Sequence, residues 1–80
     1  MSDFPQEDLA IDATGLVCPL PLLRTKKALQ GLESSQVLKV ATTDKSAVSD
    51  FKAFAKQTGH EILLQVLIDD KTTWHFIKKR

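Results

Sequence analysis

Apolar and polar residues recur along the chain with periods that predict four strands and two helices. Short runs that alternate or are rich in β-branched residues indicate strands at 8–12, 37–42, 61–68 and 72–78, the third of them buried. Between them, apolar residues return every three or four positions over 19–32 and 44–58, the spacing of one helix face. The expected order is strand, helix, strand, helix, strand, strand.

The ends of both helices carry recognisable signals. Pro19 suits a first helical turn, where its missing N–H is not needed, and Gly31 fits near the end of that helix. Asp44 is a good N-cap for the second helix, more so than a catalytic acid, and Gly59 ends it. Phe51 falls on the clearest apolar stripe and is expected in the core.

This order predicts an α/β (α+β) fold, a two-layer βαβαββ sandwich. A right-handed crossover makes the first two strands parallel, and the last two form an antiparallel hairpin around residues 69–71. Both helices then cover one face of a mixed four-stranded sheet. The pattern leaves the facing of Trp74 open, because both alternating sets of its strand include an apolar residue. Residues 1–7 are expected to form a flexible tail and residues 8–80 a single domain.

Composition narrows the function classes. A chain of 80 residues has little apolar surface to spare for a deep cavity, which favours a carrier or a small binding module. A single cysteine excludes an internal disulfide, and a net charge of +1 disfavours bulk nucleic-acid binding. The first twelve residues are acidic, unlike a targeting peptide, and the apolar runs are too short to span a membrane. We expect a cytoplasmic monomer without a membrane segment.

Cys18 is the main candidate for chemistry. It lies where a loop opens the first helix, and the partial positive charge of a helix N-terminus favours a thiolate. Arg24 and Lys27, one to two turns further on, would add positive potential. A lowered thiol pKa and a reactive sulfur are therefore expected. The alternative is a buried structural cysteine, since free cysteines are among the most buried residues.

Several segments together carry a family resemblance. They are Asp12-Ala13-x-Gly15-Leu16-x-Cys18-Pro19-x-Pro21, Lys26-Lys27-Ala28-Leu29, Thr43-Asp44-x-x-Ala47 and Gly59-His60. From about Leu9 to Lys79 the chain resembles the TusA/SirA family of small sulfur-carrier proteins. Leu20 stands where the member that feeds tRNA thiolation has an acidic residue, and Ser34-Ser35 replace a common turn glycine.

The resemblance implies a sulfurtransferase-type carrier with a similar fold. Cys18 would accept a sulfane sulfur as a persulfide and relay it to a partner protein, for tRNA thiolation or another sulfur-trafficking pathway. The implied partners are proteins: a cysteine desulfurase or rhodanese-like donor, and a downstream acceptor. Whether such a carrier counts as an enzyme stays open at this point. No cofactor, metal or direct nucleic-acid contact is expected.

Two other functions compete with this interpretation. A regulatory or interaction module would dock through the sheet face opposite the helices, with Lys39 and Gln65 on it. A redox sensor would dimerise through Cys18, the lone cysteine.

The remaining candidates favour structural roles. The separation of His60 and His75 is not that of a metal finger. Asp12 either contacts the cysteine loop or is an exposed strand end, and the Lys78-Lys79-Arg80 run is typical of a solvated tail, with an acidic partner or RNA as the alternative. Aromatic residues of the last strand, Trp74 and Phe76, indicate packing rather than base stacking.

Overall fold

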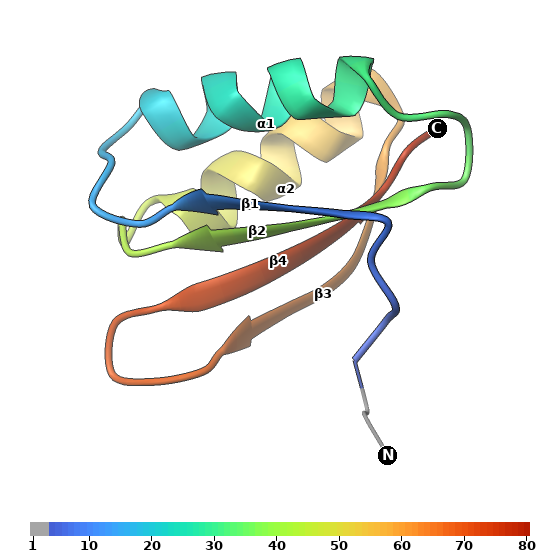
Figure 1. Ribbon diagram of the computed structural model, residues 1–80. Coiled ribbons are helices and arrows are strands. Elements are labelled where there is room, and N and C mark those ends of the chain that lie inside the picture. The colour runs from blue at the N-terminus through green and yellow to red at the C-terminus, as the bar shows by residue number, and fades with distance from the viewer. Residues whose placement is uncertain (1–3) are drawn as a thin grey trace.

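Two helices lie side by side on one face of a four-stranded sheet (Figure 1). This computed structural model describes residues 4–80. Its elements are β1 (Leu9–Ala13), α1 (Leu20–Gln30), β2 (Val37–Thr42), α2 (Ala47–Thr58), β3 (Glu61–Leu67) and β4 (Thr73–Lys78). The predicted βαβαββ order and the α+β sandwich are confirmed, with no element end shifted by more than three residues. No helix within residues 4–80 has the length and apolar character needed to cross a membrane.

The sheet is mixed, with strand order β1-β2-β4-β3. β1 and β2 are parallel, as a right-handed crossover through α1 requires. β4 returns between β2 and β3 and is antiparallel to both. The two parallel strands therefore end at the same edge of the sheet, and the loops that lead into α1 and α2 meet there (Figure 1).

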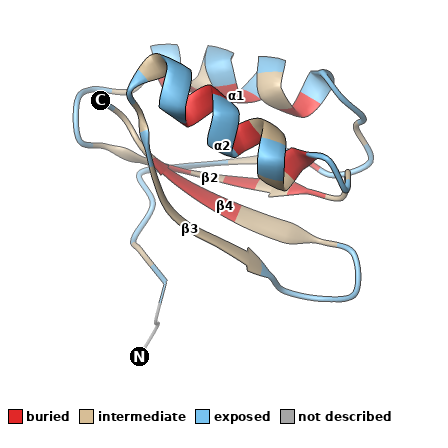
Figure 2. Cartoon of the chain, turned by 180° about the vertical axis from the view of Figure 1, so that it is seen from behind, coloured by how far each residue is buried: buried red, intermediate tan, exposed pale blue. Residues whose placement is uncertain are grey.

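The core lies between the helices and the sheet. On β2, Leu38, Val40 and Thr42 alternate toward the helices and are buried. The stripe predicted on α2 faces them, and Figure 2 shows buried residues concentrated along the inner sides of both layers. The Phe51 ring is fully buried, with its centre 4.3 Å from that of the His75 ring.

The facing of the last strand is now resolved. His75 and Ile77 point to the helices and are fully buried, so Trp74 and Phe76 lie on the opposite, open face of the sheet. Lys39 lies on that open face as expected, but the placement of Gln65 there was wrong. Its side-chain amide bonds the Val48 carbonyl of α2. A register shift between Ile62 and Leu64 interrupts the alternation of side chains along β3, so the residues after it point to the face opposite the one that strict alternation predicts. Gln65 therefore points to the helices.

β3 was predicted to be a buried strand, and this is also wrong. It is an edge strand whose residues are mostly half-buried, and Leu67 is 63% exposed. Figure 2 shows the contrast with β4, which lies inside the sheet. A run of apolar residues indicates that a strand packs against an apolar surface, but it does not show whether the strand lies at the edge or in the middle of the sheet.

Residues 4–7 and residues 79–80, at the two ends of the described part of the chain, contact the folded body. Of the expected tail, residues 1–3 lie outside the described residues, and residues 4–7 lie across the open face of the sheet. At the other end, the Lys79 ammonium donates to the Leu29 carbonyl at the end of α1, at 2.7 Å. Arg80 packs against Gly59, whose left-handed φ of +83° ends α2 as predicted. The expectation of a solvated basic tail is therefore wrong for Lys79.

Candidate functional site

Cys18 lies in the loop that joins β1 to α1, and this loop is fixed at several points. The Asp12 carboxylate accepts hydrogen bonds from the N–H and hydroxyl of Thr14, at 2.9 and 2.6 Å. Gly15 follows with a φ of +79°, a conformation that favours glycine. Its N–H donates to the Thr43 hydroxyl at 2.8 Å. Both interpretations of Asp12 therefore hold: it is exposed near the end of β1, and its carboxylate bonds Thr14 at the start of the cysteine loop.

Asp44 holds the cysteine itself. The Cys18 N–H donates to Asp44 Oδ2 at 2.8 Å, and the same carboxylate accepts from the N–H and hydroxyl of Ser46, at 3.2 and 3.0 Å. These N–H groups, Ser46 first and Cys18 second, hold the pKa of Asp44 below its ordinary value, so the carboxylate is charged at neutral pH. Asp44 was predicted as the N-cap of α2, but Ser46 occupies that position, without a side-chain capping bond. The carboxylate instead bridges the two loops.

The Cys18 side chain is exposed, which excludes the alternative of a buried structural cysteine. α1 begins two residues later at Leu20, with Pro19 as its N-cap and Pro21 in its first turn. The Cys18–Pro19 peptide bond is cis. The thiol is therefore presented at the amino end of α1, as the sequence predicts.

A groove between the two helices receives the thiol. Cys18, Leu22 and Lys26 are four residues apart and therefore lie along one side of α1 and of the loop before it. The residues of α2 that face them recur at spacings of three and four. The groove has a volume of about 320 Å³. Its lining from α2 is Asp50, Ala53, Phe54, Gln57 and Thr58. Apolar side chains, one lysine, one carboxylate and two uncharged polar side chains thus extend from the sulfur along the helix pair.

The electrostatic environment of the thiol is acidic, contrary to the sequence-based expectation. Hydrogen bonding to the Asp50 carboxylate raises the pKa of the Cys18 thiol, and burial and the negative charges of Asp50 and Asp44 act in the same direction. The predicted lowering of this pKa was wrong. Two carboxylates beside the sulfur outweigh the partial positive charge of the helix end, which falls off within one turn.

The basic residues of α1 do not compensate. Arg24 and Lys27 line a different hollow, beside Leu9 and Ile11 at the β1 edge. Lys26 is the lysine of the cysteine groove. Helical spacing explains the difference, because residues six and nine positions after Cys18 point away from the side on which residue 22 and residue 26 lie.

Replacing Asp50 by Asn should lower the pKa of Cys18, because it removes the charge that favours the protonated thiol. Below the thiol pKa, each unit of lowering raises the thiolate fraction, and hence the alkylation rate, about tenfold. The pH profile of iodoacetamide alkylation measures the shift. Asp70→Asn, the same change in the β3–β4 turn, is the matched control and should leave the profile unchanged. A profile for Asp50→Asn that overlays the unchanged protein would contradict the assignment.

The other polar candidates lie apart from this site. His60 accepts a hydrogen bond from the N–H of Arg80 at 3.1 Å, beyond the end of α2. His75 is buried under the helices and bonds Thr42 and Gln65. Within residues 4–80, no group of three or more histidine, cysteine, aspartate or glutamate side chains is arranged to hold a metal ion.

Sequence reasoning missed Asp50 and Thr43 as members of the site. Thr43 was named only within the segments that carry the family resemblance, and Asp50 lies in the first turn of α2, where acidic residues are common without a functional role. The available signal was the parallel arrangement of β1 and β2, which brings their following loops to one edge of the sheet. Helical spacing then places Asp50 on the side of α2 that also carries Phe54.

Comparisons with known proteins agree with this geometry. Residues 9–79 match the family model described as sulfurtransferase TusA. The chain is 49% identical over 80 residues to the sulfur carrier protein TusA of Allochromatium vinosum, covering 100% of this chain and 99% of the relative. It is 39% identical over 80 residues to the TusA of Pseudomonas putida, covering 100% and 98%.

A solved structure supports the fold. The crystal structure of a SirA-like protein from Desulfitobacterium hafniense superposes with a TM-score of 0.78 at 30% identity, covering 88% of this chain and 95% of that one. Residues 9–79, which match the family model, span the sheet, both helices and the loops that hold the exposed thiol. The chain belongs to the TusA family of sulfur carrier proteins.

Proposed function

We propose that this chain carries sulfane sulfur as a persulfide on Cys18 and relays it between protein partners in the cytoplasm. The observation that carries the proposal is the exposed lone thiol, held by Asp44 at the mouth of the interhelical groove. Relatives that match this chain from end to end are named sulfur carriers. The donor would be a cysteine desulfurase or a rhodanese-like protein, and the acceptor a protein of tRNA thiolation or of another sulfur-trafficking route.

The transfer needs no external oxidant or reductant. The Cys18 thiolate attacks the terminal sulfur of a donor persulfide, a new S–S bond forms, and the donor leaves as a thiolate. In the second step an acceptor thiolate attacks the outer sulfur on Cys18, and the Cys18 thiolate leaves. Both steps follow the rules of thiol–disulfide exchange. A chain with one cysteine has no internal thiol to release the sulfur prematurely.

The raised pKa of Cys18 suits carriage more than rapid catalysis. In exchange reactions a thiol of higher pKa is the poorer leaving group. Asp50 therefore slows loss of the outer sulfur to small thiols that meet the protein in solution. A docked partner that neutralises Asp50 or Asp44 would lower this pKa and assist departure of the Cys18 thiolate.

Intact-mass spectrometry after incubation with a cysteine desulfurase and cysteine tests the proposal. We expect the mass to rise by one sulfur atom, and a reductant to reverse the gain. Cys18→Ser should abolish it completely, because no other thiol is present. If the unchanged protein gains no sulfur while a known carrier is loaded under the same conditions, the proposal is wrong.

A further inference from the structure

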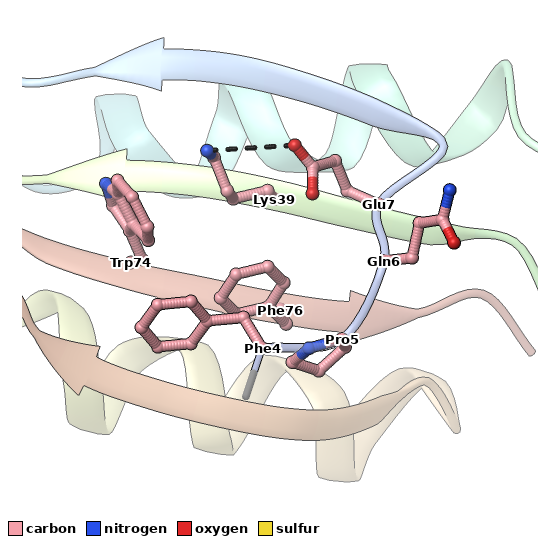
Figure 3. A pocket seen from close by; sticks show the side chains of 7 residues that line it. All are labelled: Phe4, Pro5, Gln6, Glu7, Lys39, Trp74 and Phe76. Atoms are coloured by element: carbon pink, nitrogen blue, oxygen red, sulfur yellow. Dashed lines mark ion pairs between the residues drawn. The ribbon is translucent and has the colours of Figure 1, made fainter. Parts of the chain in front are cut away.

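The open face of the sheet carries an aromatic surface that the sulfur chemistry does not use. Trp74 and Phe76 of β4, together with Lys39 of β2, line a hollow of about 560 Å³. The helices lie on the other face (Figure 1). The hollow is completed by Phe4, Pro5, Gln6 and Glu7 from the start of the chain, as Figure 3 shows. We call Trp74, Phe76 and Lys39 the open-face site.

The Phe4 side chain binds the two rings of this site. Its ring centre lies 5.9 Å from that of Phe76, with the planes 10° apart, a stacked arrangement. It lies 5.6 Å from that of Trp74, with the planes 70° apart, an edge-to-face arrangement. Both geometries are favourable for aromatic pairs. The open-face site thus already accepts one aromatic side chain from an extended segment (Figure 3).

Lys39, the third residue of the open-face site, favours a negatively charged group in the segment that binds there. The Lys39 ammonium lies 3.7 Å from Glu7 Oε2 and 4.0 Å from the centre of the Trp74 ring. A cation over an indole face is attracted by the ring and offers its remaining donors to a carboxylate. The carboxylate comes three residues after the aromatic ring in the segment that occupies the site. This spacing is a recognition pattern that another chain could present.

The segment is held in a way that permits exchange. Phe4 remains 38% exposed, so much of its ring is still in contact with solvent. The Lys39–Glu7 pair lies near the surface, where ion pairs are weak and screened by salt. Pro5 restricts the residue before it to extended conformations, which lowers the entropy lost on binding.

We propose that the open-face site is a peptide-docking surface that residues 4–7 occupy within the chain. Its partner is an extended protein segment with an aromatic side chain followed three residues later by a carboxylate. Such a segment replaces Phe4 and Glu7 on Trp74, Phe76 and Lys39. Because the site and the Cys18 groove lie on opposite sides of the sheet, a partner held here leaves the thiol free for a second protein. The inference does not require sulfur transfer, so the two proposals can fail separately.

The single tryptophan provides the measurement, since its indole N–H gives one resolved NMR signal. In the full-length Phe4→Ala, Glu7→Gln variant we expect this signal to move from its position in the unchanged protein. A synthetic peptide with the sequence of residues 1–8 should return it toward that position, with saturation at millimolar concentration. The unchanged protein should need about tenfold more peptide, because its own segment competes at an effective concentration in the millimolar range.

Matched peptides test the pattern. A peptide with Phe4→Ala or Glu7→Gln should bind more weakly, and one with Gln6→Ala should bind as well as the parent, because the Gln6 side chain points away from the two rings (Figure 3). The proposal is overturned if the variant and unchanged proteins give the same indole signal, or if the Phe4→Ala peptide binds as well as the parent. It is also overturned if a short single-stranded RNA, or self-association of the protein, shifts the signal where the peptide does not.

Discussion

Phe51→Ala should lower the free energy of unfolding by about 4 kcal/mol, the typical cost of removing a buried phenylalanine ring. Phe51 is fully buried in the cluster formed by α1, α2 and the sheet, and its ring packs on His75. In a domain of this size the melting temperature should fall by more than about 15 °C. Urea denaturation followed by circular dichroism measures the change.

Two further substitutions make this result specific. Phe51→Leu retains most of the apolar volume and should cost less than about 2 kcal/mol. Phe4→Ala removes the same ring from a position 38% exposed, and should cost less than about 1 kcal/mol. Equal losses for Phe4→Ala and Phe51→Ala would contradict the observed burial. If Phe51→Ala is unfolded at room temperature, Phe51→Leu supplies the measurement.

We expect the protein to lose stability as the pH falls below about 6.5, because of His75. This pH is well above the range in which carboxylates titrate. The Gln65 amide donates to the Val48 carbonyl at 3.0 Å and therefore also donates to His75 Nδ1, 3.1 Å away. The imidazole proton is then on Nε2 and faces the Thr42 hydroxyl at 2.7 Å. A second proton on Nδ1 would confront the amide donor in a buried site. Burial lowers the pKa of His75 from 6.5 to about 4.

Proton binding by the folded and the unfolded chain determines whether acid stabilises or destabilises the protein. The unfolded chain takes up a proton at this residue near pH 6.5 and the folded chain only near pH 4, so stability is complete above the upper value and falls between the two. The shift corresponds to roughly 3 kcal/mol, a large fraction of the stability of a small domain. Urea unfolding measured from pH 7 to pH 4 should show this decline.

Two histidine variants distinguish the effect of His75 on acid stability from the effects of other titratable groups. His75→Gln should lower stability at neutral pH and flatten the decline between pH 6.5 and pH 4, because the titrating ring is gone. His60→Gln is the matched control: burial, Lys79 and Arg80 lower the pKa of His60, which is far less enclosed. It should leave most of the decline in place. An unchanged slope in His75→Gln would assign the acid sensitivity elsewhere.

The fold was largely predictable because periodicity and topology agree. The α2 stripe places Phe51 and Phe54 in the core, and the crossover rule makes β1 and β2 parallel. The two wrong predictions of the fold, for Gln65 and for β3, concern features that depend on how the strands pair with one another. The register shift at Ile62 and Leu64 turns Gln65 to the helices, and the edge position of β3 leaves Leu67 exposed.

The site was predictable at Cys18 but not in its surroundings. Local sequence alone places the Cys18 thiol at the amino end of α1, where the structure has it exposed. The charge around the thiol depends on Asp44 and Asp50, which come 26 and 32 residues later and reach the sulfur only through the packing of α2 beside α1. A pKa set by tertiary neighbours cannot be obtained from the sequence near the cysteine.

The hydrogen bonds between the cysteine loop and residues 43–46 make the presentation of the thiol a property of the folded chain. Gly15 and Cys18 are held by side chains of Thr43 and Asp44, which leave the ribosome well after them. A nascent or partly unfolded chain has the same sulfur atom without a fixed direction, without its carboxylate neighbours and without a groove. Slow alkylation at neutral pH is therefore the expected signature of native assembly, because an unfolded chain lacks the carboxylate neighbours that raise the pKa of the thiol.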